Sequence, residues 1–103
     1  MKIYLSGKIT GDENYKAKFN AMAEKLKALG YAVFNPAILP EGFDYEDYMK
    51  IDLAALSTCD AILLMDNLVN SPGAIRERNA AEKMGIEIIN EDDIFFLNQA
   101  KVG

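Results

Sequence analysis

The sequence predicts an α/β fold in which a parallel sheet of four or five strands carries helices on both faces. Short apolar runs alternate with helical patterns four times, and the links between them are short. The run AILLM, residues 61–65, is apolar without interruption, as a strand buried on both faces of a parallel sheet requires. Of the 103 residues, 50% are hydrophobic, which is enough for one domain with a core but not for two. We therefore expect residues 1–103 to form a single three-layer domain of the flavodoxin-like or Rossmann-like type.

The first strand and the first helix follow from the pattern of residues 2–30. IYL is a β-leaning run, and it enters GKITGDEN, whose glycines and polar residues mark a loop. In the next segment, apolar side chains recur at spacings of three and four: Tyr15, Phe19, Met22, Leu26 and Leu29. This spacing predicts an amphipathic helix over residues 14–29, which Gly30 ends.

The same alternation continues along the rest of the chain. YAVF predicts the second strand, and NPAILPEGF predicts a loop that ends at Asp44, a plausible helix cap. The second helix runs from Tyr45 to about Cys59, and AILLM forms the third strand. Ser71 caps the third helix, with Pro72 at its first position. IEII predicts the fourth strand, and EDDIFFLNQA predicts a short last helix.

Composition and charge exclude several classes of function. A net charge of −5 argues against a surface that binds a nucleic-acid backbone, although it permits a local cationic site for a small anion. With one cysteine, Cys59, and no histidine, the chain cannot form an internal disulfide, a cysteine–histidine nucleophile pair or a histidine-containing zinc site. MKIYLSGKIT lacks the apolar core of a signal peptide, and no apolar run approaches the roughly 18 residues of a membrane span. We expect a cytoplasmic protein with no cofactor and no nucleic-acid, membrane or metal partner.

Two carboxylates lie on the buried faces of their predicted helices. At about 100° per residue, Glu77 falls in the middle of the apolar arc that includes Ala74 and Ala81. Asp52 falls in the apolar arc of the second helix, close to Leu56. Neither carboxylate has a cation three or four positions away along its helix, and the apolar stripe of the first helix contains no charge. Both acids therefore need a specific explanation.

A buried carboxylate without a partner has a raised pKa, and two explanations fit such a residue. The first is a tertiary hydrogen bond, or a position at the rim of the buried face. The second is a ligand cavity that both carboxylates face, which is favoured because the third helix begins at the crevice where parallel sheets bind ligands. Paired carboxylates with split pKa values carry out glycosyl transfer, in which one attacks the anomeric carbon and the other moves protons. Glycosidic chemistry is thus the leading hypothesis.

Four segments of the chain resemble a known superfamily, and together they cover nearly the whole sequence. IYLSGKITG, VFNPA, YEDYMKIDLAALSTCDAILLM and NSPGAIRERNAA are similar to small phage and bacterial proteins of the nucleoside 2-deoxyribosyltransferase-like superfamily, which includes nucleoside 5′-monophosphate N-glycosidases. The resemblance implies Glu77 as the nucleophile that forms a glycosyl-enzyme. It implies Asp52 as the residue that assists proton transfer at the leaving base, and Tyr4 as the residue that positions the nucleophile or the sugar. Such an enzyme would be a transferase or a hydrolase of nucleotide metabolism.

The resemblance also bears on the substrate. Transferases of this superfamily that use free nucleosides tend to have aspartate six residues before the glutamate, whereas the monophosphate glycosidases have serine there. Ser71 occupies this place and indicates a 5′-monophosphate. A simple helix cap explains the same serine, and the two roles are compatible because a helix start offers N–H groups to a phosphate. The predicted substrate-binding residues are Gly7, Lys8, Thr10, Gly11, Asn35, Ser71 and Gly73.

Several alternatives stay open at the level of the sequence. A nucleotide-binding or sensing module would keep the pocket without turnover, and an NAD glycohydrolase would use one glutamate on a similar sheet. Asn35 fits a hydrogen bond to a ligand or to the backbone equally well. Tyr45 and Tyr48 fit stacking on a base, but tyrosines at this spacing are more often part of a core. Because relatives complete their sites across subunits and IFFL offers apolar residues that so small a core is not expected to absorb, we expect a homodimer or a higher homo-oligomer.

Overall fold

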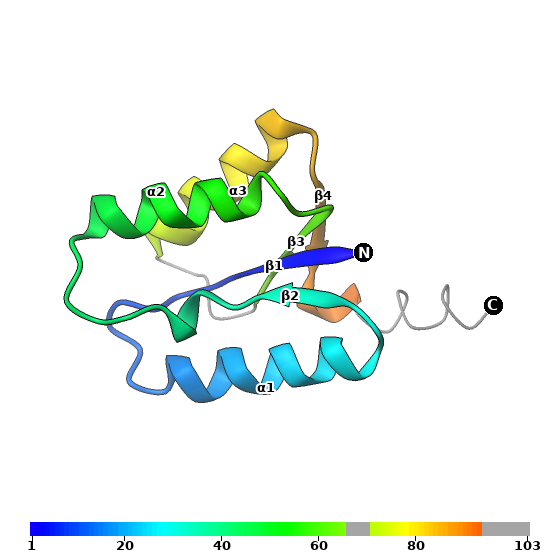
Figure 1. Cartoon of the computed structure of the whole chain (residues 1–103), viewed down its shortest axis with the longest axis horizontal. Coiled ribbons are helices and arrows are strands. Elements are labelled where there is room, and N and C mark those ends of the chain that lie inside the picture. Colours follow the sequence, from blue (N-terminus) through cyan, green and yellow to red (C-terminus); the bar gives the residue numbers. More distant parts are fainter. Residues whose placement is uncertain (66–70, 94–103) are drawn as a thin grey trace.

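The structure, a computed structural model, describes residues 1–65 and 71–93 and contains a four-stranded parallel sheet (Figure 1). The strands lie in the order β2-β1-β3-β4, so that β1 and β3 are the inner strands. Their bounds are β1 (Lys2–Ser6), β2 (Ala32–Phe34), β3 (Ala61–Leu64) and β4 (Glu87–Asn90). The chain leaves β1 toward β2 on one side and returns to β3 on the other. The predicted three-layer α/β fold with a parallel sheet is confirmed.

The helices follow the predicted order, with one shorter than expected. They are α1 (Tyr15–Ala28), η1 (Pro36–Ile38), α2 (Tyr45–Leu56), α3 (Pro72–Met84) and η3 (Glu91–Asp93). The prediction that the second helix extends to about Cys59 is wrong, because α2 ends at Leu56. Ser57 and Thr58 donate side-chain hydrogen bonds of 2.6 Å to backbone carbonyls of the last turn, and such bonds compete with continuation of a helix. Of the predicted last helix, EDD forms η3, and the rest lies outside the described residues.

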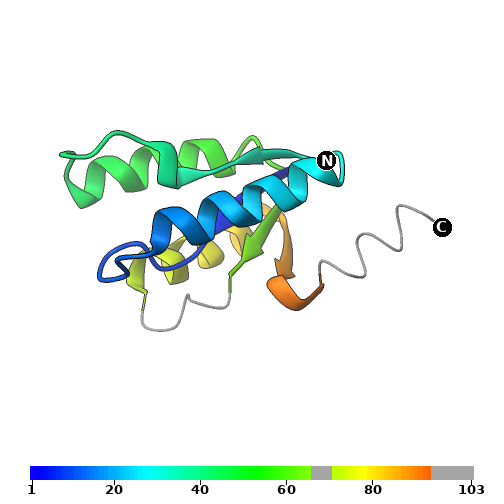
Figure 2. The same ribbon diagram turned by 90° about the horizontal axis from the view of Figure 1, so that it is seen from below.

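Alternate side chains of β1 enter two separate cores, one on each face of the sheet. Ile3 and Leu5 pack against α1, whose buried side chains include Phe19. Tyr4 points to the opposite face and packs with Leu56 of α2 and with α3. Figure 1 shows α2 and α3 on one side of the sheet and α1 on the other, and Figure 2 shows α1 in front of the strands. The sheet therefore separates α1 from the two helices that carry Asp52 and Glu77.

Local signals fix where α3 begins and ends. The Ser71 hydroxyl oxygen accepts a hydrogen bond of 3.3 Å from the Ala74 N–H, and Pro72 occupies the first helical position, where no N–H is needed. At the other end Gly85 adopts a left-handed conformation with φ of 73°, which suits glycine because it has no Cβ. These signals place Glu77 in the second turn of α3, near the helix end that faces the loops.

Two further expectations concern the membrane and self-association. Among its described helices, none is both long enough and apolar enough to cross a membrane. The expected self-association rests partly on IFFL, residues 94–97, which lie outside the described residues. Self-association therefore stays a prediction.

Candidate active site

Glu77 of α3 lies at the centre of a buried hydrogen-bond network. The Tyr4 hydroxyl donates to Glu77 Oε2 at 2.5 Å, and the Ser6 hydroxyl donates to Glu77 Oε1 at 2.8 Å. Glu77 is 6% exposed, and both donors are fully buried. Within residues 1–65 and 71–93, no lysine or arginine forms an ion pair with this carboxylate. Neutral hydroxyl groups therefore bind both oxygens of Glu77.

The geometry of β1 places the two donors under α3. Side chains alternate along a strand, so Tyr4 and Ser6 point to the same face of the sheet. The Tyr4 ring stacks on Phe34 of β2, with ring centroids 5.5 Å apart, and the two residues are register partners. Stacking between aromatic rings on neighbouring strands restricts the tyrosine side chain. This contact fixes the direction in which the Tyr4 hydroxyl points, which is toward Glu77.

Asp52 of α2 is the second buried acid of the site. It is 6% exposed, and its Oδ1 atom accepts no hydrogen bond from the part of the chain that the structure describes. α2 packs against α3, and Asp52 lines the same cavity as Glu77. A buried carboxylate oxygen that lacks a donor carries a desolvation penalty, which a ligand with a donor group removes. Asp52 is therefore suited to contact a bound molecule.

The two carboxyls have raised pKa values that differ from each other. Burial raises the pKa of Glu77 to about 8, although the hydrogen bonds from Tyr4 and Ser6 favour the ionised form. Burial raises the pKa of Asp52 to about 6, and the nearby Glu77 carboxyl and Tyr4 hydroxyl limit this rise. Burial and the two neighbouring carboxyls hold the pKa of the Tyr4 hydroxyl far above its ordinary value, so it stays a donor. Between about pH 6 and pH 8 the carboxyl pair therefore shares one proton.

A cavity of about 580 Å³ lies beyond the carboxyl ends of β1 and β2, and its volume is within the range of small-molecule sites. Glu77 and Asp52 line it on the side of α2 and α3. The loop after β1, the segment from η1 to α2 and the first turn of α3 form the other sides. Open parallel sheets bind ligands at the carboxyl ends of their strands where the strand order reverses, and here the connections that follow β1 and β3 run in opposite directions.

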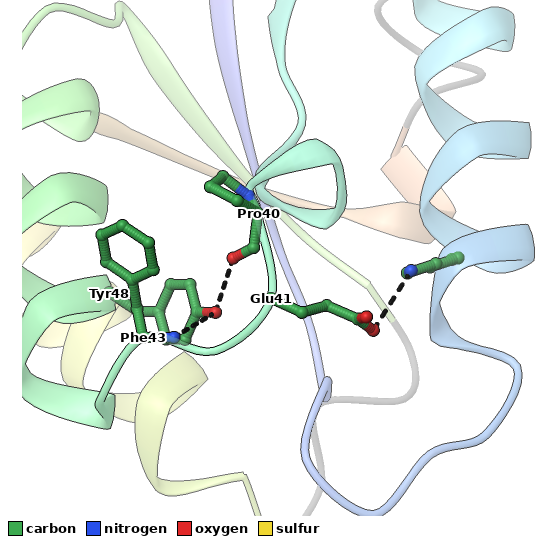
Figure 3. A network of polar contacts seen from close by, with 5 residues as sticks. Pro40, Glu41, Phe43 and Tyr48 are labelled. Atoms are coloured by element: carbon green, nitrogen blue, oxygen red, sulfur yellow. Dashed lines mark hydrogen bonds and ion pairs between the residues drawn. The ribbon is translucent and has the colours of Figure 1, made fainter.

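The segment between η1 and α2 forms one wall of the cavity, and Figure 3 shows how it is held. The Tyr48 hydroxyl of α2 donates to the Pro40 carbonyl at 2.6 Å and accepts from the Phe43 N–H at 3.2 Å. Glu41, which lines the cavity, forms an exposed ion pair of 3.3 Å with Lys16 of α1. The wall is thus attached to helices on both faces of the sheet.

The first turn of α3 and the loop after β1 provide groups that suit an anion. Ser71 and Gly73 line the cavity at the helix start, where N–H groups and the helix dipole favour negative charge. The Ser71 oxygen accepts the capping bond, and a hydroxyl also carries a proton that it can donate. Lys8 and Thr10 line the cavity from the loop after β1. The two carboxyls and the N-terminal turn of α3 therefore face one cavity.

Most of the predicted site residues meet at this cavity, but three do not line it. Tyr4 lies behind Glu77, which it reaches through its hydroxyl. Gly11 is outside the wall, and so is Asn35, whose side chain accepts from the Ala37 N–H at 3.0 Å and donates to Asn20 at 2.9 Å. Asn35 therefore bonds to the backbone at the start of η1. The lining residues from the predicted set are Asp52, Glu77, Gly7, Lys8, Thr10, Ser71 and Gly73.

Sequence reasoning missed one residue of the site and misjudged two others. Ser6 was not singled out, although its spacing of two from Tyr4 on a strand is the signal that places both on one face. The interpretation of Tyr45 and Tyr48 as core residues is wrong. Tyr45 is 48% exposed and lines the cavity, while the Tyr48 hydroxyl bonds to the loop. No group of residues that could hold a metal ion occurs in the described ranges.

Two solved structures with a similar arrangement of strands and helices are a 2-deoxyribosyltransferase and a CMP N-glycosidase. A 2-deoxyribosyltransferase from the psychrotolerant bacterium Bacillus psychrosaccharolyticus is 24% identical and superposes with a TM-score of 0.70, over 87% of this chain and 71% of that one. The CMP N-glycosidase BcmB of Clostridium botulinum is 23% identical, with a TM-score of 0.66, over 87% of this chain and 70% of that one. The resemblance to the nucleoside 2-deoxyribosyltransferase-like superfamily is thus confirmed at the level of the fold.

A match of the sequence to a family model shows the family to which the chain belongs. The model of DUF4406, a domain of unknown function, matches residues 1–90, and the chain belongs to that family. No curated protein matches the sequence at a significant level. The match covers both buried carboxyls, the two hydroxyl donors on β1 and all the residues that line the cavity.

We predict that Glu77→Gln changes the dependence of stability on pH. A carboxyl whose pKa is about 8 when folded and 4.5 when unfolded binds more protons in the folded state, so the free energy of unfolding falls as pH rises from 4.5 to 8. Glutamine removes this contribution. Chemical denaturation at several pH values should show the variant close to the parent at pH 4 and more stable by a few kcal/mol at pH 9, since each pKa unit corresponds to about 1.4 kcal/mol.

Glu82→Gln is the matched control for this experiment. Glu82 lies on the same helix, but its side chain is 68% exposed and pairs with Arg78 at the surface. Its variant should follow the parent at every pH, because exposed ion pairs contribute little. A difference between Glu77→Gln and the parent that is the same at pH 4 and pH 9 would contradict the raised pKa of Glu77.

Proposed function

We propose that the protein cleaves or transfers the N-glycosidic bond of a nucleoside or deoxynucleoside 5′-monophosphate, or of the free nucleoside, with Glu77 as the nucleophile. The observation that carries this proposal is the pair of buried carboxyls, Glu77 and Asp52, that face one cavity. The raised pKa values of both carboxyls support it. The fold adds support, because its structural neighbours are a 2-deoxyribosyltransferase and a CMP N-glycosidase.

The chemistry needs one ionised and one protonated carboxyl. Because Glu77 has the higher pKa, the shared proton lies mostly on Glu77 in the free protein. The reactive form is the minor one in which this proton has moved to Asp52, and there the ionised Glu77 attacks the anomeric carbon while the C–N bond breaks. Asp52 gives its proton to the leaving base. A water molecule or a second base then displaces Glu77 from the sugar and returns a proton to Asp52. Tyr4 and Ser6 hold the two oxygens of Glu77, so the orientation of the nucleophile is set before the substrate binds.

The preference for a monophosphate rests on the first turn of α3. Ser71 can cap the helix with its oxygen and donate its proton to a phosphate oxygen. The N–H groups of the same turn carry the positive end of the helix dipole. Gly73 lines the cavity there without a side chain that would block close approach of a phosphate to the backbone.

The first test is release of free base from a panel of nucleoside 5′-monophosphates and nucleosides, followed by chromatography. The parent should release base from at least one compound, with monophosphates preferred. Glu77→Gln should lose the activity by at least about a thousandfold while it stays folded, because the amide cannot form the glycosyl-enzyme. No release from any compound at high enzyme concentration would remove the catalytic proposal, and nicotinamide release from NAD alone would replace it with NAD hydrolysis.

A second test concerns the role of Ser71, and it uses two substitutions. Ser71→Asp keeps a good helix cap but adds a negative charge, so kcat/KM for the monophosphate should fall about a hundredfold while that for the nucleoside is retained. Ser71→Ala should lower the monophosphate preference by about tenfold, as loss of one hydrogen bond to a charged group predicts. Equal losses for both substrates in both variants would place the phosphate elsewhere.

A third test is the dependence of kcat/KM on pH. We expect a bell-shaped profile with limbs near pH 6 and pH 8, because activity requires one proton on the carboxyl pair. Below the lower limb both carboxyls are protonated, so no ionised nucleophile is present, and above the upper limb both are ionised, so no proton can be given to the leaving base. Asp52→Asn should remove the upper limb and leave a profile that only rises. A flat profile from pH 5 to pH 9 in a folded protein would contradict the shared proton.

A nucleotide-binding module without turnover is the remaining alternative. Isothermal calorimetry separates it from the enzyme, because a sensor would bind a nucleotide with saturation and release no base. The unpartnered Asp52 oxygen would then serve recognition alone. Nucleotide binding by Glu77→Gln, together with a parent protein that releases no base, would favour the binding module.

A further inference from the structure

Tyr48 is placed so that one hydroxyl group closes the loop of residues 40–43. It donates to the Pro40 carbonyl at 2.6 Å and accepts from the Phe43 N–H at 3.2 Å (Figure 3). Its ring lies against the Phe43 ring, with centroids 5.9 Å apart. A hydroxyl can donate and accept at the same time, so both loop ends are bound through one oxygen atom.

The two bound groups are those that a β-turn normally joins directly. In a four-residue turn the first carbonyl accepts from the fourth N–H, and here the Tyr48 oxygen is inserted between them. Gly42, the third residue, has φ of 97°, and a positive φ at this position is typical of a type II turn. Closure of the loop therefore depends on two separable features, the Tyr48 hydroxyl and the glycine at position 42.

The closed loop forms the cavity wall. Leu39 and Glu41, the neighbours of Pro40, both line the cavity, and so does Tyr48 itself. Tyr48 and Asp52 are four residues apart on α2 and therefore share one face of that helix. The hydrogen bonds of Tyr48 thus hold the wall in place relative to α2, the helix that carries Asp52.

We propose that Tyr48 is a positioning residue that holds residues 39–41 in contact with the leaving base of the substrate. The proposal rests on the proposed function and names the part of the cavity that receives the base. The wall is largely apolar, with Pro36, Ala37 and Leu39, and suits a flat heterocycle. The first turn of α3 suits the phosphate instead. A wall that is ordered before binding costs less conformational entropy when the substrate arrives.

Tyr48→Phe tests this role, because it removes the hydroxyl and keeps the ring. Amide hydrogen exchange of Phe43, measured by NMR in the protein without substrate, should accelerate by about tenfold as its acceptor is lost. KM for the preferred nucleotide should rise about three- to tenfold, since a lost hydrogen bond changes an equilibrium by that much. kcat should stay within about twofold, because Glu77 and Asp52 keep their positions.

A second variant and a control complete the experiment. Gly42→Ala strains the same turn through its backbone, and it should also raise KM. If the hydroxyl and the glycine act through one closed loop, the double variant should show less than the product of the two single effects. Tyr31→Phe, the same chemical change at a residue outside the cavity wall, should leave Phe43 exchange and KM unchanged.

The outcomes separate this proposal from the function on which it rests. Unchanged Phe43 exchange in Tyr48→Phe would overturn the closed loop, whatever the activity. Faster exchange with unchanged KM would overturn the role toward the substrate, as would a loss confined to kcat. If the parent neither binds nor cleaves any nucleotide or nucleoside, the proposed function fails and the substrate role of Tyr48 fails with it, while Phe43 exchange still decides whether the hydroxyl closes the loop.

Discussion

The burial of Glu77 between neutral donors is the constraint on which the rest of the site depends. A lysine or arginine at this place would hold the carboxylate ionised through its positive charge. Two hydroxyl groups stabilise the charge less, so burial dominates and the pKa stays high. The carboxyl is therefore close to the point at which a small change in its surroundings ionises it. A bound ligand beside Asp52 is one such change.

The hydrogen bonds to Glu77 determine which strands and helices need a precise position relative to one another. Tyr4 and Ser6 can reach Glu77 because β1 is an inner strand and α3 crosses the face to which both side chains point. The stack of Tyr4 on Phe34 extends the requirement to the register of β2. On the opposite face, Ile3 and Leu5 need only apolar partners of suitable volume from α1. The two faces of the same strand therefore differ in how tightly they constrain the sequence.

The sequence was sufficient for the fold and for the two acids, but not for the contacts between elements. Helical periodicity placed Glu77 and Asp52 on buried faces, because side-chain direction along a helix is a local property. Ser6, whose hydroxyl donates to Glu77, is separated from it by 71 residues, and no local pattern contains that distance. Tyr48 shows the same limit. Its spacing fits a core position, yet it lies beside the end of a loop whose carbonyl and N–H groups bind its hydroxyl. From the sequence, Asn35 fits a hydrogen bond to a ligand or to the backbone, and in the structure its side chain accepts from the Ala37 N–H of η1.

The net charge of the protein acts on an anionic ligand at long range, whereas the groups that line the cavity act on it at short range. A net charge of −5 repels a nucleotide at a distance, although screening at physiological salt limits this repulsion to about 8 Å from each charge. An anion bound at the start of α3 would lie close to the N–H groups of that turn, and this attraction would be screened much less. The same cavity contains the two carboxyls, which would repel a phosphate if both were ionised. Sharing one proton between Glu77 and Asp52 reduces that repulsion near neutral pH, so the raised pKa values make the cavity more favourable for an anion.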